Sequence, residues 1–329
     1  MSKKAQIFEG FKQLQVLVIG DLMIDSYTWG KVNRISPEAP VPVVNVNKRE
    51  DRLGGAGNVV RNLVSLGAKP HVVSVVGQDA NAQVLKKLFK ELDVETSGII
   101  EDPKRPTTVK ERILAGSQQL LRIDAETDVL ISEVLQQEVL IKVKNILPLV
   151  QVLIFEDYDK GVLGENLIKE IIQLAKKQGV PTVVDPKKRN FFAYQGVDLF
   201  KPNLAELRDG LGLSKEDLSD DALPKVVKEF KEKQAINGLF VTLSERGVYI
   251  DFDGQTAKIP AHIRQIADVS GAGDTVISIA ACALALGLPA KEIAALANLG
   301  GGLVCESLGV VPIELDRLIE EWENEKFSF

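Results

Sequence analysis

A carboxylate surrounded by small residues lies near the C-terminus, in the run Asp268-Val-Ser-Gly-Ala-Gly-Asp-Thr275. The next residues, 276–286, are apolar on nearly all sides, which predicts a buried helix whose first turn lies at or just after Gly273. The first N–H groups of a helix have no intrahelical partner, and glycines let an anion approach them. We expect this helix end to stabilise Asp274 as an anion, a weak base for a hydroxyl group that attacks phosphorus. A tight turn with Asp274 as a helix cap is the alternative.

Composition narrows the class of protein. With 329 residues and 45% hydrophobic content, the chain suits one large α/β domain, and a net charge of −6 argues against a nucleic-acid or anionic-membrane surface. Two cysteines in apolar surroundings and two histidines predict neither a disulfide framework nor a transition-metal site. The polar residues 1–10 lack a signal-peptide core, and no apolar run is long enough to span a bilayer. We therefore expect a cytoplasmic protein.

Short apolar runs alternate with helical segments along the chain. This order predicts an α/β fold with a doubly wound, mostly parallel sheet and a ligand crevice at the carboxyl ends of its strands. No linker divides residues 1–329, so we expect a single domain. The predicted strands lie at 15–20, 71–77, 152–155, 182–185, 199–201 and 239–243, followed by a hairpin at 248–252 and 256–260. The predicted helices lie at about 57–66, 80–92, 132–145, 168–179, 290–304 and 312–324.

Two segments predict a small β-strand lid, at about 28–50 and 100–123. The first has three prolines and an alternating stretch at 41–46, which is typical of an edge strand. The second alternates as a hairpin with basic and polar side chains on one face. Lys110, Arg112 and Arg122 on that face could meet an anionic substrate, or the face could simply be solvated.

Other polar groups stand where strands end and helices begin. Asp25 follows the first strand, and Gly55-Ala-Gly57 precedes a helix without the third glycine or the strand of a dinucleotide fingerprint. Asn203 and Glu206, three apart on the first turn of a helix, either bind a metal or form a capping box. There is no Walker A pattern. The sequence thus combines an anion hole, a base, and acids with lysines at strand ends. This combination suits the binding of magnesium, phosphates and a hydroxyl acceptor.

The run from Asp268 to Thr275 resembles the C-terminal signature of the ribokinase-like (PfkB) carbohydrate kinases. The resemblance implies ATP and Mg²⁺ as cofactors, with Asp274 as the catalytic base. The amides that would hold the transferring phosphoryl group belong to Gly271, Ala272 and Gly273. The residues implied for Mg²⁺ are Asn203 and Glu206, and those implied for the nucleotide are Asn203, Thr242, Ser244, Gly247 and Asn298.

Longer runs are similar to a narrower group, the D-glycero-D-manno-heptose 7-phosphate kinases of lipopolysaccharide-core biosynthesis. The most specific is Arg34-Ile-Ser-Pro-Glu-Ala-Pro-Val-Pro42; the others are Gly20-Asp-Leu-Met-Ile-Asp-Ser-Tyr27, Gly54-Gly-Ala-Gly-Asn58, Gln118-Gln-Leu-Leu-Arg-Ile-Asp124, Asp157-Tyr-Asp-Lys-Gly161 and Val184-Asp-Pro-Lys187. This resemblance implies phosphorylation of the heptose at O1 to the 1,7-bisphosphate for ADP-heptose biosynthesis, with any adenylyltransferase step on a separate protein. The heptose would contact Asp25, Gly55, Asn58 and the lid, and its 7-phosphate would contact Arg112, Arg122, Lys160 or Lys187. Another sugar or nucleoside kinase, or a non-catalytic sugar or nucleotide sensor, are the alternatives.

Two further expectations concern partners of the kinase unit. Asp268 lies where members of the family often bind a monovalent cation, so K⁺ is implied; an Asp that caps the loop is the alternative. The lid segments have unpaired strand edges and an apolar face, and pairing across a two-fold axis would cover both. We therefore expect a homodimer.

Overall fold

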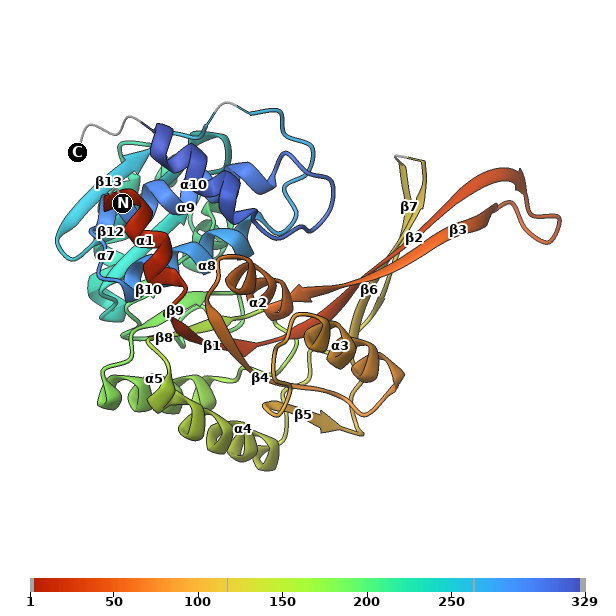
Figure 1. The fold of residues 1–329 in the computed structure, drawn as a ribbon, viewed down its shortest axis with the longest axis horizontal. Helices are drawn as coiled ribbons and strands as arrows, with labels where there is room; N and C mark the ends of the chain where they lie inside the picture. The colour runs from red at the N-terminus through yellow and green to blue at the C-terminus, as the bar shows by residue number, and fades with distance from the viewer. Residues whose placement is uncertain (1–2, 117, 263, 326–329) are drawn as a thin grey trace.

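The computed structural model describes residues 3–116, 118–262 and 264–325, so parts of the expected ranges 1–329 and 100–123 lie outside the described residues. Helices cover both faces of a nine-stranded sheet, and a separate four-stranded sheet projects from one side of this body (Figure 1). The predicted doubly wound, mostly parallel sheet with a β-strand lid is confirmed.

The order of the strands creates a crevice next to the first strand. The large sheet has the order β13-β12-β11-β10-β9-β8-β1-β4-β5, and all neighbours from β5 to β11 are parallel. The chain builds one half outward from β1 through β4 and the other half from β8, so the winding direction reverses between β1 and β8, where α/β sheets bind ligands. The strands are β1 (Gln15–Gly20), β4 (Lys69–Gly77), β5 (Ile99–Asp102), β8 (Val152–Glu156), β9 (Thr182–Asp185), β10 (Leu199–Phe200), β11 (Gly238–Thr242), β12 (Val248–Phe252) and β13 (Gln255–Ile259).

Side-chain alternation along the central strands fills two apolar cores. In β1, Val16 and Val18 face a core shared with α2, α8 and α9, whereas Leu17 and Ile19 face a core shared with α4, α5 and α7. Both faces of a parallel sheet are thereby covered, as its continuous apolar strands require. No helix in the described ranges has both the length and the apolar character needed to cross a bilayer. The α-helices are α1 (Lys3–Phe11), α2 (Ala56–Ser65), α3 (Ala80–Glu91), α4 (Glu133–Ile146), α5 (Glu165–Gln178), α6 (Leu204–Leu211), α7 (Leu223–Gln234), α8 (Ala272–Ala285), α9 (Ala290–Val304) and α10 (Leu315–Asn324), and the 3₁₀ turns are η1 (Leu147–Leu149), η2 (Glu216–Leu218) and η3 (Ser244–Arg246).

The four-stranded sheet, which we call the lid, has the order β3-β2-β6-β7. Its strands are β2 (Leu22–Ile35), β3 (Pro42–Gly55), β6 (Thr108–Ala115) and β7 (Gln118–Ala125). It therefore begins earlier than the expected residue 28, whereas residues 99–102 belong to the large sheet. The proline-containing strand β3 lies at an edge of the lid, as predicted. Because β2 follows β1 after one residue and β3 runs directly into α2, the lid is joined to the body next to the crevice.

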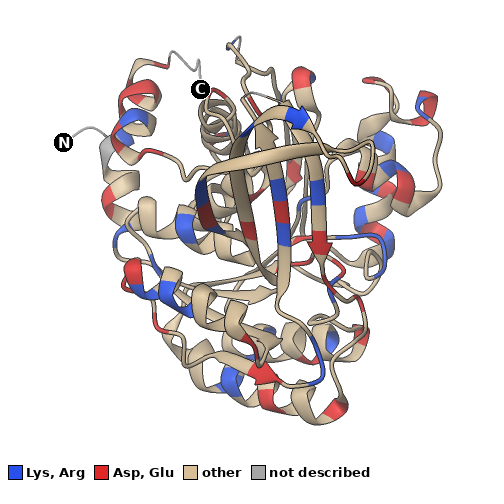
Figure 2. Ribbon diagram, turned by 90° about the vertical axis from the view of Figure 1, so that its right-hand side faces the viewer, with Lys and Arg blue, Asp and Glu red and all other residues tan. Residues whose placement is uncertain are grey.

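One face of the lid is charged. Cross-strand register aligns Tyr27 with Glu50 and Arg112, and aligns Arg112 with Arg122, so these side chains lie on the same face. The neighbouring row on this face contains Asp25, Arg52, Lys110 and Asp124. Figure 2, which looks onto the lid, shows acidic and basic positions interspersed along its strands. The predicted basic and polar face of the 107–124 hairpin is confirmed.

Candidate active site

Helix α8 begins in a conformation that only glycine adopts easily. Gly271 is the N-cap residue and has left-handed backbone angles, φ 80° and ψ 0°. A Cβ at this position would also lie 2.9 Å from Nδ2 of Asn58. Ala272 and Gly273 form the first turn, and a Cβ on Gly273 would lie 3.6 Å from Oδ2 of Asp185. The predicted helix start is confirmed, and the N–H of Ala272 donates to the carbonyl oxygen of Val269 at 3.3 Å.

Asp274 lies in the first turn of α8 and is only 5% exposed. Its Oδ2 accepts a hydrogen bond from Nδ2 of Asn58 at 2.7 Å, and its Oδ1 accepts one from the Tyr158 hydroxyl at 2.9 Å. Burial raises the pKa of Asp274 to about 6, and the negative charge of Asp185 adds to the rise, although the two hydrogen bonds oppose it. The expectation that the helix end stabilises the anion was wrong in direction. Desolvation outweighs the hydrogen bonds that the carboxylate accepts, so Asp274 is a stronger base than expected.

The glycines before α2 bring Asn58 to Asp274. Gly55 has φ 55°, and a Cβ there would lie 2.5 Å from the backbone oxygen of Asp21. This close approach turns the chain from β3 into α2, whose first turn carries Asn58. Asn58 is fully buried, and its Oδ1 has no hydrogen-bond partner among the described residues. The predicted sugar-contacting group therefore also orients the candidate base.

Asp25 and Arg112 meet on the charged face of the lid. Nη1 of Arg112 lies 2.5 Å from Oδ1 of Asp25, and the guanidinium also stacks over the ring of Tyr27 at 5.3 Å. Burial lowers the pKa of Arg112, but the adjacent Asp25 carboxylate outweighs burial and raises it. Arg112 is thus a fully charged group beside the crevice. The resemblance implied a phosphate contact for Arg112, and the structure pairs Arg112 with the carboxylate of Asp25.

Two other predicted phosphate contacts have acidic partners of their own. Arg122 is exposed and donates to Asp124 at 2.9 and 3.0 Å. Lys160, in the loop after β8, lies 3.0 Å from Glu126. Neither forms an ion pair with the Asp25–Arg112 group, although Arg122 lies directly opposite Arg112 in the β6–β7 pair.

A buried lysine balances the acids at the ends of β8 and β9. Lys201 follows β10, its side chain is 2% exposed, and its Nζ lies 2.8 Å from Oδ2 of Asp185. Burial raises the pKa of Asp185, but the charges of Lys201 and Lys187 outweigh burial and lower it. Lys187 lies 3.7 Å from Asp185, forms an ion pair with Glu206, and stacks over the Tyr158 ring at 5.3 Å.

Asn203 and Glu206 form a complete capping box at the start of α6. Oδ1 of Asn203 accepts from the Glu206 N–H at 2.8 Å, and Oε2 of Glu206 accepts from the Asn203 N–H at 2.8 Å. The capping alternative is thus present in the structure. Oxygen groups still suit Mg²⁺, which keeps much of its water shell when bound to proteins. The donor set therefore fits a magnesium ion held through water.

The residues assigned to the nucleotide lie around the end of β11. Thr242 pairs with Asn203 in an isolated parallel bridge, and Ser244 begins the turn η3. Gly247 closes that turn with φ 87° and ψ −129°, and a Cβ there would lie 2.0 Å from the backbone oxygen of Ile259. Asn298 on α9 is buried and donates to the Pro260 carbonyl at 2.9 Å, so it holds the chain that follows β13.

Asp268 joins two loops behind α8. Its Oδ1 accepts from the Ser270 N–H at 2.9 Å, and its Oδ2 accepts from the Gly309 N–H at 3.0 Å. Burial raises the pKa of Asp268, but these hydrogen bonds outweigh burial and lower it, which keeps the group anionic. The loop-capping alternative is present in the structure.

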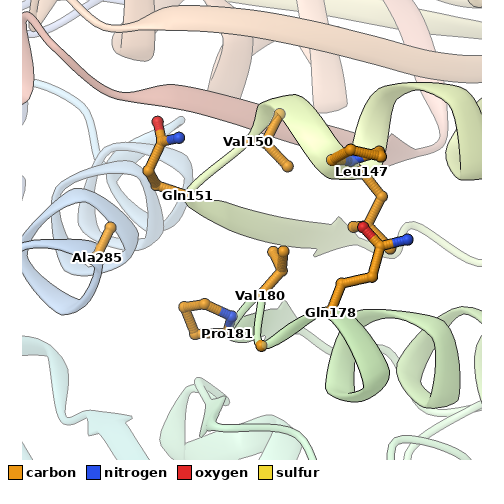
Figure 3. A pocket seen from close by; sticks show the side chains of 9 residues that line it. Leu147, Val150, Gln151, Gln178, Val180, Pro181 and Ala285 are labelled. Atoms are coloured by element: carbon orange, nitrogen blue, oxygen red, sulfur yellow. The ribbon is translucent and has the colours of Figure 1, made fainter.

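A surface hollow of about 640 Å³ lies elsewhere (Figure 3). It is lined by uncharged residues from the turns that precede β8 and β9, including Gln151, Val180 and Pro181, and by Ala285 at the far end of α8. Its lining contains no titratable side chain. The titratable side chains of the candidate active site therefore lie at the opposite ends of these strands, away from this hollow.

The sequence pattern of the family described as "pfkB family carbohydrate kinase" matches residues 13–316. The chain belongs to the pfkB family of carbohydrate kinases. Its relatives include the "Bifunctional protein HldE" of Syntrophotalea carbinolica, 42% identical over 97% of this chain and 65% of that protein. The protein of the same name from Aliarcobacter butzleri is 40% identical over 94% of this chain and 64% of that protein. The chain thus spans slightly less than two thirds of the length of these relatives.

Solved structures share the fold of this chain. Phosphofructokinase-2 from Escherichia coli in complex with potassium superposes with a TM-score of 0.78, at 17% identity, over 95% of this chain and 99% of that one. Arabidopsis thaliana ribokinase complexed with ribose and ATP superposes with a TM-score of 0.72, at 18% identity, over 96% and 99% of the two chains. At these identities the likeness establishes the shared fold.

Three groups in this kinase were not assigned from the sequence. Tyr158 lies in the quoted run 157–161, and Lys201 lies at the end of the predicted strand 199–201, where a lone charge after apolar residues was the signal. Asp21 accepts three backbone hydrogen bonds, from the N–H groups of Tyr158, Lys160 and Val162, at 2.9 to 3.1 Å. It therefore shapes the loop that carries Tyr158.

We predict that Lys201→Met destabilises the kinase strongly. The substitution keeps the bulk but leaves Asp185 buried without its closest cation, a loss that typically costs about 3–5 kcal/mol. Lys225→Met is the matched control, because Lys225 is 81% exposed and its surface ion pair contributes about 0–1 kcal/mol. Urea unfolding measures both. A loss below about 1 kcal/mol for Lys201→Met would contradict the role of Lys201 in charge balance.

Proposed function

We propose that the chain is the ATP-dependent kinase of a sugar phosphate, specifically D-glycero-D-manno-heptose 7-phosphate, which it phosphorylates at O1. The observation that carries the proposal is Asp274, a buried carboxylate with a raised pKa at the glycine-rich start of α8. The resemblance of the run at 34–42 to heptose 7-phosphate kinases directs the proposal to this sugar and to ADP-heptose biosynthesis. The described residues would act as one kinase unit, with the four-stranded sheet as a lid over the sugar.

In the proposed reaction, the O1 hydroxyl attacks the γ-phosphorus of ATP, the bond to the ADP oxygen breaks, and the hydroxyl proton moves to Asp274. Asn58 and Tyr158 hold the carboxylate in position for this transfer. The N–H groups of Gly271 and Gly273, and that of Ala272 once it leaves the Val269 carbonyl, would meet the charge of the phosphoryl group at the helix start.

The charged face of the lid supports a phosphorylated substrate. Arg112 and Arg122 lie directly opposite each other on β6 and β7, so two guanidinium groups are available to one phosphate, which would replace their acidic partners Asp25 and Asp124. We propose that the 7-phosphate binds at these two residues, with Lys160 at the rim and Lys187 closer to the nucleotide. Asp25, Gly55 and Asn58 would contact the sugar hydroxyls.

ATP would bind at the end of β11, with its adenine near Asn298 and its phosphates near Thr242, Ser244 and Gly247. Mg²⁺ would neutralise phosphate charge in the bound nucleotide. We propose that Asn203 and Glu206 hold it through coordinated water, since their oxygens also serve the capping box.

The direct test is ATP turnover with a panel of acceptors. We expect ADP release with heptose 7-phosphate to exceed that with fructose 6-phosphate, ribose and a nucleoside, and the product to be the 1,7-bisphosphate. Preference for another acceptor would assign a different pfkB-type kinase. No turnover with any acceptor, despite measurable binding, would favour a sensor.

We predict that Asp274→Asn reduces kcat by about 10²–10⁴-fold, because the change removes the base and keeps its shape. Nucleotide affinity, measured by calorimetry, should stay nearly unchanged and serves as the folding control. Asp253→Asn, in the exposed β12–β13 turn, is the matched substitution and should not affect turnover. Turnover near that of the wild type in Asp274→Asn would refute the assignment.

We predict that Tyr158→Phe moves the acidic limb of the kcat profile to higher pH. Asp274 must be ionised to accept a proton, so the rate should fall as pH drops through a pKa of about 6. The Tyr158 hydroxyl lowers that pKa, and its removal should raise it. The substrate phosphate also titrates near pH 6, but identically with both enzymes. An unchanged limb would argue against coupling between Tyr158 and the base.

We propose that K⁺ binds behind α8 with Asp268 among its ligands and reinforces the positive field of the helix start. The anionic state of Asp268 and its position between the Ser270 and Gly309 loops support this proposal. We predict slower turnover when tetramethylammonium replaces K⁺ at equal ionic strength. Equal rates in the two salts would leave Asp268 as a loop cap alone.

We propose a homodimer that pairs the outer faces of two lids. Opposite the charged face, β7 exposes Leu121 and Ile123 at 54% and 46%, and Ile35 near the tip of β2 is 61% exposed. We predict that light scattering at assay concentrations gives about twice the chain mass of 35.9 kDa, and that Ile123→Glu halves it. A monomer mass together with full activity would refute the dimer.

A further inference from the structure

Three carboxylates converge inside the body, beneath the start of α8. Glu156 ends β8, Asp185 ends β9, and Asp274 lies in the first turn of α8. The register of the sheet aligns Glu156 with Asp185 and with Gly20 of β1, at the point where the winding direction reverses. One oxygen from each carboxylate lies within 4.8 Å of the other two, and all three side chains are buried.

Glu156 takes no part in the contacts described so far. It is 0% exposed, and neither of its carboxylate oxygens accepts a hydrogen bond from the described residues. Oδ1 of Asp185 likewise accepts none, whereas its Oδ2 is bound by Lys201. Both oxygens of Asp274 are engaged, by Asn58 and Tyr158. Three oxygens of the Glu156–Asp185 pair therefore accept no hydrogen bond, and one of them, Oδ1 of Asp185, lies 3.7 Å from Nζ of Lys187.

The charges around this pair do not cancel. Lys201 and Lys187 are the cations closest to Asp185, and they face three carboxylates. Lys187 is shared with Glu206. Buried carboxylates without partners are costly, and proteins that keep them pair them, protonate them or coordinate a metal.

We propose that Glu156 and Asp185 bind a divalent cation of the Mg²⁺ or Mn²⁺ class directly. Hard cations of this class take oxygen ligands at about 2.0–2.2 Å, so two ligands on opposite sides of the ion are about 4.2 Å apart. An oxygen of Glu156 and one of Asp185 lie within 4.8 Å of each other, so at most a small contraction brings the two carboxylates to this separation. This site differs from the Asn203–Glu206 pair, whose oxygens already accept hydrogen bonds in the capping box.

The position of the site indicates its role. A Cβ on Gly273 would lie 3.6 Å from Oδ2 of Asp185, so the cation borders the N–H groups at the start of α8. A cation there adds positive charge where an anionic group would bind, and it offsets the charge of Glu156 beside Asp274. Asp274 borders the site without being a ligand, since both of its oxygens are occupied.

The test uses Mn²⁺ alone, with no nucleotide and no sugar, on the full chain. Electron paramagnetic resonance of free Mn²⁺ gives the affinity for the wild type, for Glu156→Gln and for Glu138→Gln, a matched change at an exposed position of α4. We expect one Mn²⁺ per wild-type chain and at least about tenfold weaker binding by Glu156→Gln, because even the loss of an outer-shell partner costs about 10–100-fold. Glu138→Gln should bind within about twofold of the wild type.

Thermal unfolding checks that the result is not a folding defect. Mn²⁺ should raise the Tm of the wild type and of Glu138→Gln, but not that of a folded Glu156→Gln. Wild type that binds no Mn²⁺ without nucleotide, or Glu156→Gln that binds it equally well, overturns the site and leaves Glu156 as a protonated, neutral acid. Because no step requires phosphoryl transfer, failure here is distinguishable from failure of the proposed kinase activity.

Discussion

Burial of carboxylates at the carboxyl ends of neighbouring strands is the constraint on which the rest of this site depends. Parallel strands covered on both faces release their polar residues at one edge, and the glycine-rich start of α8 closes over that edge. Asp185 remains charged there because Lys201 is buried beside it. Asp274 has no cation as close, and its pKa rises to about 6. Different partners thus give the two carboxylates different chemistry.

The same constraint extends to the loops and the lid. Asp21, at the end of β1, holds the loop after β8 through three N–H groups, and that loop delivers the Tyr158 hydroxyl to Asp274. The lid strand β3 runs into α2, which delivers Asn58 to the other oxygen of Asp274. Movement of the lid would therefore shift Asn58 and with it the Asp274 carboxylate, as in enzymes whose lids complete the catalytic geometry.

Much of this arrangement could be predicted from the sequence, because the central elements are strongly patterned. The apolar strand at 15–20 and the start of α8 were placed correctly, and the capping box at Asn203 was one of two stated alternatives. Helix α7 was not predicted, because only Leu223, Val227 and Phe230 mark its buried face within a charged segment. Strand β5 was assigned to the lid, since four residues carry too little pattern to choose a sheet.

What the sequence could not supply was the balance between burial and charge. From its helix position alone, Asp274 was expected to be stabilised as an anion. Its burial instead raises the pKa of the carboxyl group, a depth that the sequence did not reveal. The hydroxyl of Tyr158 and the ammonium of Lys201 reach the site from loops distant in the chain, so local spacing carried no signal of these contacts. Likewise, the isolation of Glu156 is a property of three elements packed together.

The central claim is that Asp274 is a buried carboxylate whose environment makes it a base near neutral pH. Carbon-13 NMR of aspartate carboxyl groups, with the Asp274 signal assigned by its loss in Asp274→Asn, measures this directly. We expect that signal to titrate with a pKa of about 6. A pKa at or below the ordinary aspartate value of about 3.9 would contradict the account, because the helix start would then dominate over burial.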